Sequence, residues 1–216
     1  MAAPVYGGIS AVSTSRTPTS VALSGSNTVG IVFVVGTTTT DLITATEWGS
    51  GVPMTKIAAI KTPSDRWISA WWVANPASSA TITFTGGSFW RSYSLYYTGA
   101  SQTGQPDSFN TGSITSALSL SIASTVVASD CMFVMGTKGG AGTSAASGVL
   151  TNMRVSADEG ALAVGDSNGA VGTGSQTGTI TQSFAVQNLG GIAFSLAPAV
   201  GGGGATRNRL SLLGVS

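Results

Sequence analysis

The sequence predicts an all-β protein, a jelly-roll-like antiparallel β-sandwich with a short extended C-terminal arm. Short runs rich in Val, Ile, Thr and aromatic residues recur along the chain and are separated by Gly, Pro, Ser and Asn. The apolar period of a helix is absent, apart from one short helical turn expected within Leu150–Leu162. Hydrophobic residues make up 42% of the 216 residues and charged residues 8%, a composition that favours a packed core over disorder.

Alternation of apolar and hydroxyl residues assigns the faces of the expected strands. Ala80–Thr85 alternates so that Ile82 and Phe84 face the core. Ile31–Val35 is apolar on both faces and is typical of a central strand. The same reasoning directs Leu118, Leu120 and Ile122 inward. The expected strands, in chain order, are Thr19–Ser24, Gly30–Thr37, Met54–Lys61, Arg66–Ala74, Ala80–Thr85, Phe89–Thr98, Ser113–Ile122, Cys131–Thr137, Val149–Ser156, Leu162–Val164, Gly178–Thr181 and Ser183–Ala197.

Turn residues separate these strands. Thr62–Asp65 and Asn75-Pro76 are typical turn sequences, and Gly86-Gly87 between two strands predicts a tight hairpin. The segment Lys138–Gly148 is rich in Gly, Ala and Ser and predicts a long loop. We expect Asp166–Gly178 to form a loop or an edge hairpin.

The C-terminal part of the chain differs in composition from the rest. We expect one β-sandwich domain over residues 1–198, a glycine-rich linker over 199–204 and a docking arm over 205–216. The arm joins two arginines to three leucines, so we expect it to bind a neighbouring subunit by burying apolar area and pairing cations. These partner-docking residues are Arg207, Arg209, Leu210, Leu212 and Leu213.

Charge and cysteine content exclude several classes of protein. The formal net charge is +1 and there is no basic block, so no nucleic-acid partner is expected. Apolar runs are too short to span a membrane, and the first ten residues do not resemble a signal peptide. With a single cysteine, Cys131, no intrachain disulfide can form, which favours synthesis in a cytoplasm. So few charges give a free monomer little protection against self-association. This favours a subunit of a large assembly over a lone extracellular-type domain.

The residues for catalysis are missing or scattered, so we expect no enzyme. Histidine, the usual general base, is absent. The acids fall mostly in expected loops, and Asp158-Glu159 would point to opposite faces of a strand. Cys131 is expected to be a buried apolar residue rather than a nucleophile. A single cysteine without histidine excludes a zinc site, and Asp166–Asn168 is a poor calcium candidate. We therefore expect neither metal nor cofactor.

Aromatic residues are the remaining functional candidates. Trp67 and Trp71 share one face of the strand Arg66–Ala74, whereas Trp72 lies on the other. Most aromatic residues in such a fold fill the core. The alternative is a glycan-stacking surface, whose candidates are Trp67, Trp71 and Trp90.

The middle of the chain resembles a known β-sandwich pattern. Its residues are Trp67–Pro76, Ala80–Thr85, Ser94–Thr103 and Gln105–Asp107, and the pattern occurs in bacterial surface proteins and phage structural proteins of jelly-roll, concanavalin-like architecture. This sequence departs from the pattern at Ala100, where a larger apolar residue is usual. The tail Arg207–Ser216 resembles the short C-termini of tailed-phage virion proteins.

The resemblance implies a non-enzymatic virion structural protein, either a capsid decoration or cement protein or a head-associated accessory subunit. Its implied partners are the major capsid or tail subunits and further copies of itself, and its implied location is the virion, after synthesis in the host cytoplasm. The alternative is a glycan- or receptor-binding β-sandwich module of a tail fibre, with a host-surface glycan as its partner.

Overall fold

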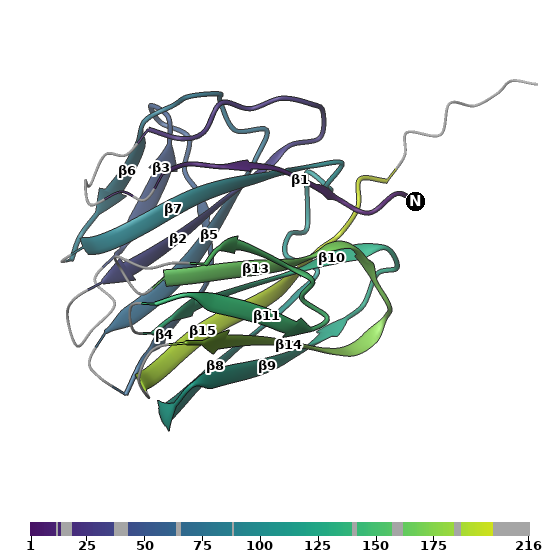
Figure 1. The fold of residues 1–216 in the computed structure, drawn as a ribbon. Coiled ribbons are helices and arrows are strands. Elements are labelled where there is room, and N and C mark those ends of the chain that lie inside the picture. Colours follow the sequence, from purple (N-terminus) through teal and green to yellow (C-terminus); the bar gives the residue numbers. More distant parts are fainter. Residues whose placement is uncertain are drawn as a thin grey trace, which may run out of the picture.

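The computed structural model describes residues 1–200, except 12, 14–18, 37–42, 64–65, 88, 140–141, 157–161 and 184–186. The described residues form antiparallel β-strands in four sheets and no helix (Figure 1). The all-β, antiparallel sandwich predicted from the sequence is confirmed. The strand order does not confirm the finer jelly-roll topology. The docking arm, 205–216, and the helical turn expected near 157–160 lie outside the described residues.

Two five-stranded sheets face each other at the centre of the molecule. The first sheet has the order β1 (Val5–Ile9), β7 (Phe89–Thr98), β2 (Val29–Gly36), β5 (Trp67–Ala74) and β4 (Thr55–Lys61). The middle sheet has the order β12 (Asn152–Val155), β13 (Leu162–Val171), β10 (Cys131–Lys138), β15 (Gln187–Leu196) and β8 (Ser108–Ala117).

Two smaller sheets cover the far faces of this pair. The outer sheet, β11 (Ser144–Gly148), β14 (Gly174–Gln182) and β9 (Ser119–Val126), packs on the middle sheet. The pair β3 (Ala45–Trp48) and β6 (Ile82–Thr85) packs on the first sheet. Three apolar cores therefore separate four layers, and the central strands of each five-stranded sheet are buried on both faces.

The central strands show why this layering suits the sequence. Every residue of β2 and of β10 is buried, so the prediction that Ile31–Val35 forms a central strand is confirmed. Phe33 of β2 stacks on Phe194 of β15, with ring centroids 5.9 Å apart. A side-chain carbon on Gly136 of β10 would lie 2.3 Å from the Phe33 ring. Glycine at this position therefore lets the first and middle sheets approach closely.

Several expected elements differ from the structure. Thr19–Ser24 forms no strand, and only Thr19 makes an isolated bridge, to Thr81. The expected strand Ser113–Ile122 is two strands that belong to different sheets, β8 and β9, and Leu118 between them is 45% exposed. That residue was predicted to face the core, which is wrong, because the chain changes sheets there.

The expected loops also contain regular structure. Within Lys138–Gly148, the last five residues form β11. Within Asp166–Gly178, the chain is strand on both sides of a bend near Gly172 and passes from the middle to the outer sheet. Gly86-Gly87 joins β6 to β7 but makes no hairpin, because β6 pairs with β3 and β7 pairs with β1 and β2.

Candidate functional site

A buried ionic cluster joins the edge of the first sheet to the edge of the middle sheet. Asp166 of β13 is fully buried and accepts two bonds from Arg154 of β12, at 2.8 and 2.9 Å. Tyr97 of β7 donates its hydroxyl proton to the same carboxylate at 3.2 Å. The Arg154 guanidinium lies 4.0 Å from the ring centre of Tyr6 in β1 and donates to Asn168 at 2.7 Å.

The electrostatics of this cluster suit a structural tie. Burial raises the pKa of Tyr97 well above its usual value, and the Asp166 charge adds to this effect. Burial disfavours the charge on Arg154, but the hydrogen bond to Asp166 and the charges of Asp166, Tyr97 and Tyr6 together outweigh burial and raise the pKa of the guanidinium. The Asp166 carboxylate accepts hydrogen bonds from Arg154, Tyr97 and the Asn168 amide. Calcium binding at the candidate site Asp166–Asn168 would therefore have to displace these protein donors.

A second polar cluster surrounds the one thiol. Asp107 accepts the backbone amides of Val127 and Ala128, at 2.8 and 3.1 Å, and the hydroxyl of Ser195 at 3.1 Å. Burial raises the pKa of Cys131 to about 12, and the neighbouring Asp107 charge acts in the same direction. Because thiolate is the nucleophilic form, Cys131 is poorly suited to attack a substrate at neutral pH.

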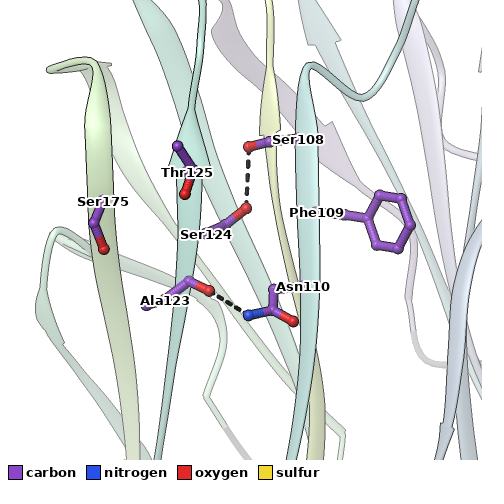
Figure 2. Close-up of a pocket in the computed structure, with 7 residues that line it drawn as sticks. All are labelled: Ser108, Phe109, Asn110, Ala123, Ser124, Thr125 and Ser175. Atoms are coloured by element: carbon purple, nitrogen blue, oxygen red, sulfur yellow. Dashed lines mark hydrogen bonds between the residues drawn. The ribbon is translucent and has the colours of Figure 1, made fainter.

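A shallow cavity of about 330 Å³ lies where β8 and β9 diverge beside β14 (Figure 2). No backbone ladder joins β8 to β9 in the described part of the chain; side chains bridge them instead. Asn110 donates to the Ala123 carbonyl at 2.7 Å, and the Ser108 and Ser124 hydroxyls are 3.0 Å apart. The cavity is lined by uncharged residues, namely Ser108, Phe109, Asn110, Ala123, Ser124, Thr125 and Ser175.

The aromatic residue of this cavity does not face its interior. Phe109 is 54% exposed, and Figure 2 shows its ring on the side of β8 away from Ser124 and Thr125. A sugar bound in the cavity would therefore meet hydroxyl and amide groups but no stacking ring. At about 330 Å³, the volume is at the low end of the range for small-molecule sites.

The free face of the outer sheet forms a regular array of hydroxyl groups, which we call the hydroxyl face. Ser119 pairs with Thr181, and Ser121 with Thr179, each with hydroxyl oxygens 2.8 Å apart. The register extends this face to Ala123, Thr125, Ala145, Ser147, Ser175 and Thr177. Strands β8, β9, β11 and β14 contain no Asp, Glu, Lys or Arg. A strand surface normally contains charges that oppose edge and face association.

One of the predicted glycan-stacking residues, Trp71, is buried. Trp71 is 3% exposed, donates to Ser69 at 3.1 Å and lies under the Lys56 ammonium, 4.6 Å from the ring centre. Its ring is therefore unavailable for stacking on a ligand. Trp67 is half-buried, with a buried ring nitrogen that has no hydrogen-bond partner. The side chain of Trp90 lies outside the description, as do all five docking-arm residues, Arg207, Arg209, Leu210, Leu212 and Leu213.

Sequence reasoning did not identify the hydroxyl face or the cavity. The signal for the hydroxyl face was present, because Gly174–Gln182 and Ser119–Val126 alternate hydroxyl residues without a single charge. The cavity had no such signal, since it is formed by three short segments that are separated along the chain, Ser108–Asn110, Ala123–Thr125 and Ser175.

Within the described residues, no three or more His, Cys, Asp or Glu side chains gather as metal ligands do. The described part also contains no helix long and apolar enough to span a membrane. Comparisons of the chain with protein-family models, with curated proteins and with solved structures found no match.

Proposed function

We propose that this chain is a non-enzymatic structural subunit of a tailed-phage virion, a capsid decoration or cement protein or a head-associated accessory protein. Its partners are the major capsid or tail subunits and further copies of itself. It is made in the host cytoplasm and functions in the virion. The resemblance of Trp67–Pro76 and of the tail Arg207–Ser216 to phage structural proteins supports the virion assignment.

The hydroxyl face is the observation that best supports a role in assembly. A contact that buries charged side chains loses their hydration, and interface centres are accordingly depleted of charged residues. The hydroxyl face loses no ionic hydration when it is covered, because its strands contain no charged residue. Paired hydroxyls such as Ser121 and Thr179 also rotate to donate to or accept from a partner.

Mass spectrometry of purified particles from the source culture tests the location. The chain should be found in particles after density-gradient purification, and its absence from them contradicts the virion assignment. Light scattering of the purified protein over a range of concentrations tests assembly, and we expect a mass above that of one chain.

Charge placed on the hydroxyl face tests its part in assembly. The double variant Ser121→Lys with Thr177→Lys should lower the association constant by about tenfold or more, because lysines resist burial. Thr55→Lys is the matched control, since Thr55 is an exposed threonine on β4, at the far edge of the first sheet. Equal association of both variants and the wild type contradicts this part of the proposal.

Binding of a neutral glycan, as in a receptor-binding module of a tail fibre, is the second candidate. The cavity between β8, β9 and β14 favours it, because its lining offers hydroxyls and an amide without charge. Asn110→Ala and Ser175→Ala should each weaken glycan-array signals several-fold. An array without signal for the wild-type protein removes this candidate.

A further inference from the structure

One end of the molecule brings together three parts of the chain. The Ala199 amide donates to the Gly99 carbonyl at 2.7 Å, and a side-chain carbon on Gly99 would lie 4.0 Å from the Ala3 carbonyl oxygen. The Met1 ammonium bonds to Asp130, in the turn between β9 and β10, at 3.0 Å. Figure 1 shows the N-terminus and the last described residues at this same end. We call this end the exit pole.

The exit pole holds the most exposed large apolar side chains in the described part of the chain. Val200 is 78% exposed, Val127 69%, Met1 64% and Val5 61%. Val127 is tied to this end because its amide donates to Asp107, whose own amide bonds to the Ser195 carbonyl near the end of β15. Exposed apolar side chains gathered in one place are typical of an interaction surface.

The charged groups described at the exit pole are two carboxylates, Asp107 and Asp130, and one cation, the Met1 ammonium. Oδ2 of Asp130 accepts the Met1 ammonium, and Oδ1 has no partner among the described residues. The side chain of Asp130 is 35% exposed, so it is accessible to a further cation. Asp107 differs, because both of its oxygens already accept backbone amides.

We propose that residues 205–216 occupy the exit pole, with Leu210, Leu212 and Leu213 covering its apolar side chains and Arg207 or Arg209 bonding to Asp130. This proposal rests on the proposed function, since it names the surface that receives the docking arm. The composition of the arm complements the pole in both respects: leucines meet exposed valines and methionine, and a guanidinium meets a carboxylate.

The reach of the chain is compatible with this placement. The description ends at Val200, which itself belongs to the pole, and Gly201–Gly204 spans at most about 14 Å when extended. The arm of a chain can therefore cover its own pole or, in an assembly, the pole of a neighbouring copy. Both arrangements bring the same side chains together.

Trypsin cleavage of the full chain tests the proposal, because Arg207 and Arg209 are cleavage sites within the arm. Intact-mass measurement reports loss of the C-terminal residues separately from cuts elsewhere. Val127→Asp and Asp130→Asn should each speed cleavage at the two arginines by about tenfold. Asp130 has a positive φ of 60°, which asparagine adopts readily, so the second variant preserves the turn.

Two variants serve as matched controls. Leu118→Asp places the same charge on an exposed apolar residue at the far end of β8, and it should leave the cleavage rate unchanged. Val52→Asp places it on an exposed apolar residue between β3 and β4 and should also have no effect. Release of the arm by either control, but not by the pole variants, overturns the proposal.

Rapid cleavage of the wild-type arm, at the rate of the Val127→Asp variant, also overturns the proposal. Light scattering of the same samples separates this result from the proposed function. If the wild-type protein associates while its arm is cleaved rapidly, assembly does not depend on the exit pole, and only the pole proposal is overturned. A protected arm on a chain that never associates supports the pole and contradicts assembly.

Discussion

The two faces of the middle sheet make contacts of different chemistry. Toward the first sheet, large aromatic side chains stack and a fully buried carboxylate bonds to an arginine and a tyrosine. Toward the outer sheet, the core consists of aliphatic, methionine and small side chains around Phe133, and the polar contacts beside it are hydroxyl groups that bond to one another and to Asp107. The outer sheet then presents hydroxyls to solvent on its other face.

The contact between the first and middle sheets should therefore stabilise the fold, whereas the hydroxyl face should tolerate substitution. Groups between the first and middle sheets depend on one another, so loss of one leaves another buried without its partner. Groups on the hydroxyl face retain water as an alternative partner. We therefore expect single substitutions to change the free energy of unfolding most between the first and middle sheets and least on the hydroxyl face.

Arg154→Ala should have the largest effect on stability. It leaves the fully buried Asp166 carboxylate without its cation, which typically costs about 3–5 kcal/mol in the free energy of unfolding. Arg154→Lys is the matched control, since it keeps the charge but loses the two-point bonding, and it should cost less. Urea denaturation measures both variants. Equal stability of Arg154→Ala and wild type would show that the ionic cluster does not stabilise the contact between the two sheets.

Gly136→Ala should have the next largest effect. The added carbon would lie 2.3 Å from the Phe33 ring, so the sheets must separate at a cost of about 1–3 kcal/mol. Gly172→Ala is the control, because its added carbon would lie 3.5 Å from the end of the Gln176 side chain. Phe33→Leu combined with Gly136→Ala should recover part of the loss, and additive losses would contradict a steric cause.

Lys138 should make stability depend on pH. Burial, with a smaller contribution from the Arg66 charge, lowers the pKa of Lys138 from 10.5 to about 8. Between pH 8 and 9 the lysine of the unfolded chain keeps a proton that the folded chain loses, so Lys138 should raise the free energy of unfolding by about 1 kcal/mol over this range. Urea denaturation at pH 7, 8 and 9 measures the rise.

Substitution of that lysine isolates its contribution. Lys138→Met should remove the rise, whereas Lys56→Met should retain it because it keeps Lys138. From about pH 8 upward Cys131 should offset part of this rise, because the folded thiol, with a pKa of about 12, keeps a proton that the unfolded thiol loses. An identical pH dependence in Lys138→Met and wild type contradicts this assignment.

Substitutions on the hydroxyl face should have the smallest effects. Ser121→Ala or Thr179→Ala removes a hydroxyl pair that is exposed to water, and each should change the free energy of unfolding by less than about 0.5 kcal/mol. Thermal melts of both single variants and the double variant measure this. A loss of 2 kcal/mol or more, of the size expected in a core, would place this pair among the groups that hold the fold.

Strand type was predictable from the sequence wherever the side-chain pattern was strong. β7 was predicted at its observed bounds, and the apolar run at Ile31–Val35 predicted a strand buried on both faces. β1 was missed because two glycines interrupt its β-forming residues, and β11 was missed because Ser144–Gly148 contains only small residues with little β-propensity. Their partners β7 and β14 hold them in strand conformation.

The candidate site was less predictable than the strands. Cys131 was expected to be buried and is, and the alternation of Trp71 and Trp72 between two faces of β5 was also correct. The cavity between β8, β9 and β14 was missed, because the expected strand Ser113–Ile122 ran through the point where the chain changes sheets.

The sequence by itself determined that this protein is β-rich, uncharged over long stretches and able to bury a large core. Those properties depend on local pattern and composition, which each segment contains independently of its neighbours. Only the tertiary structure decided that four sheets form three cores, that Arg154 meets Asp166 and Tyr97, and that apolar side chains gather at the exit pole. Strand pairing joins residues far apart in the chain, and local alternation specifies a strand's faces but not its partner.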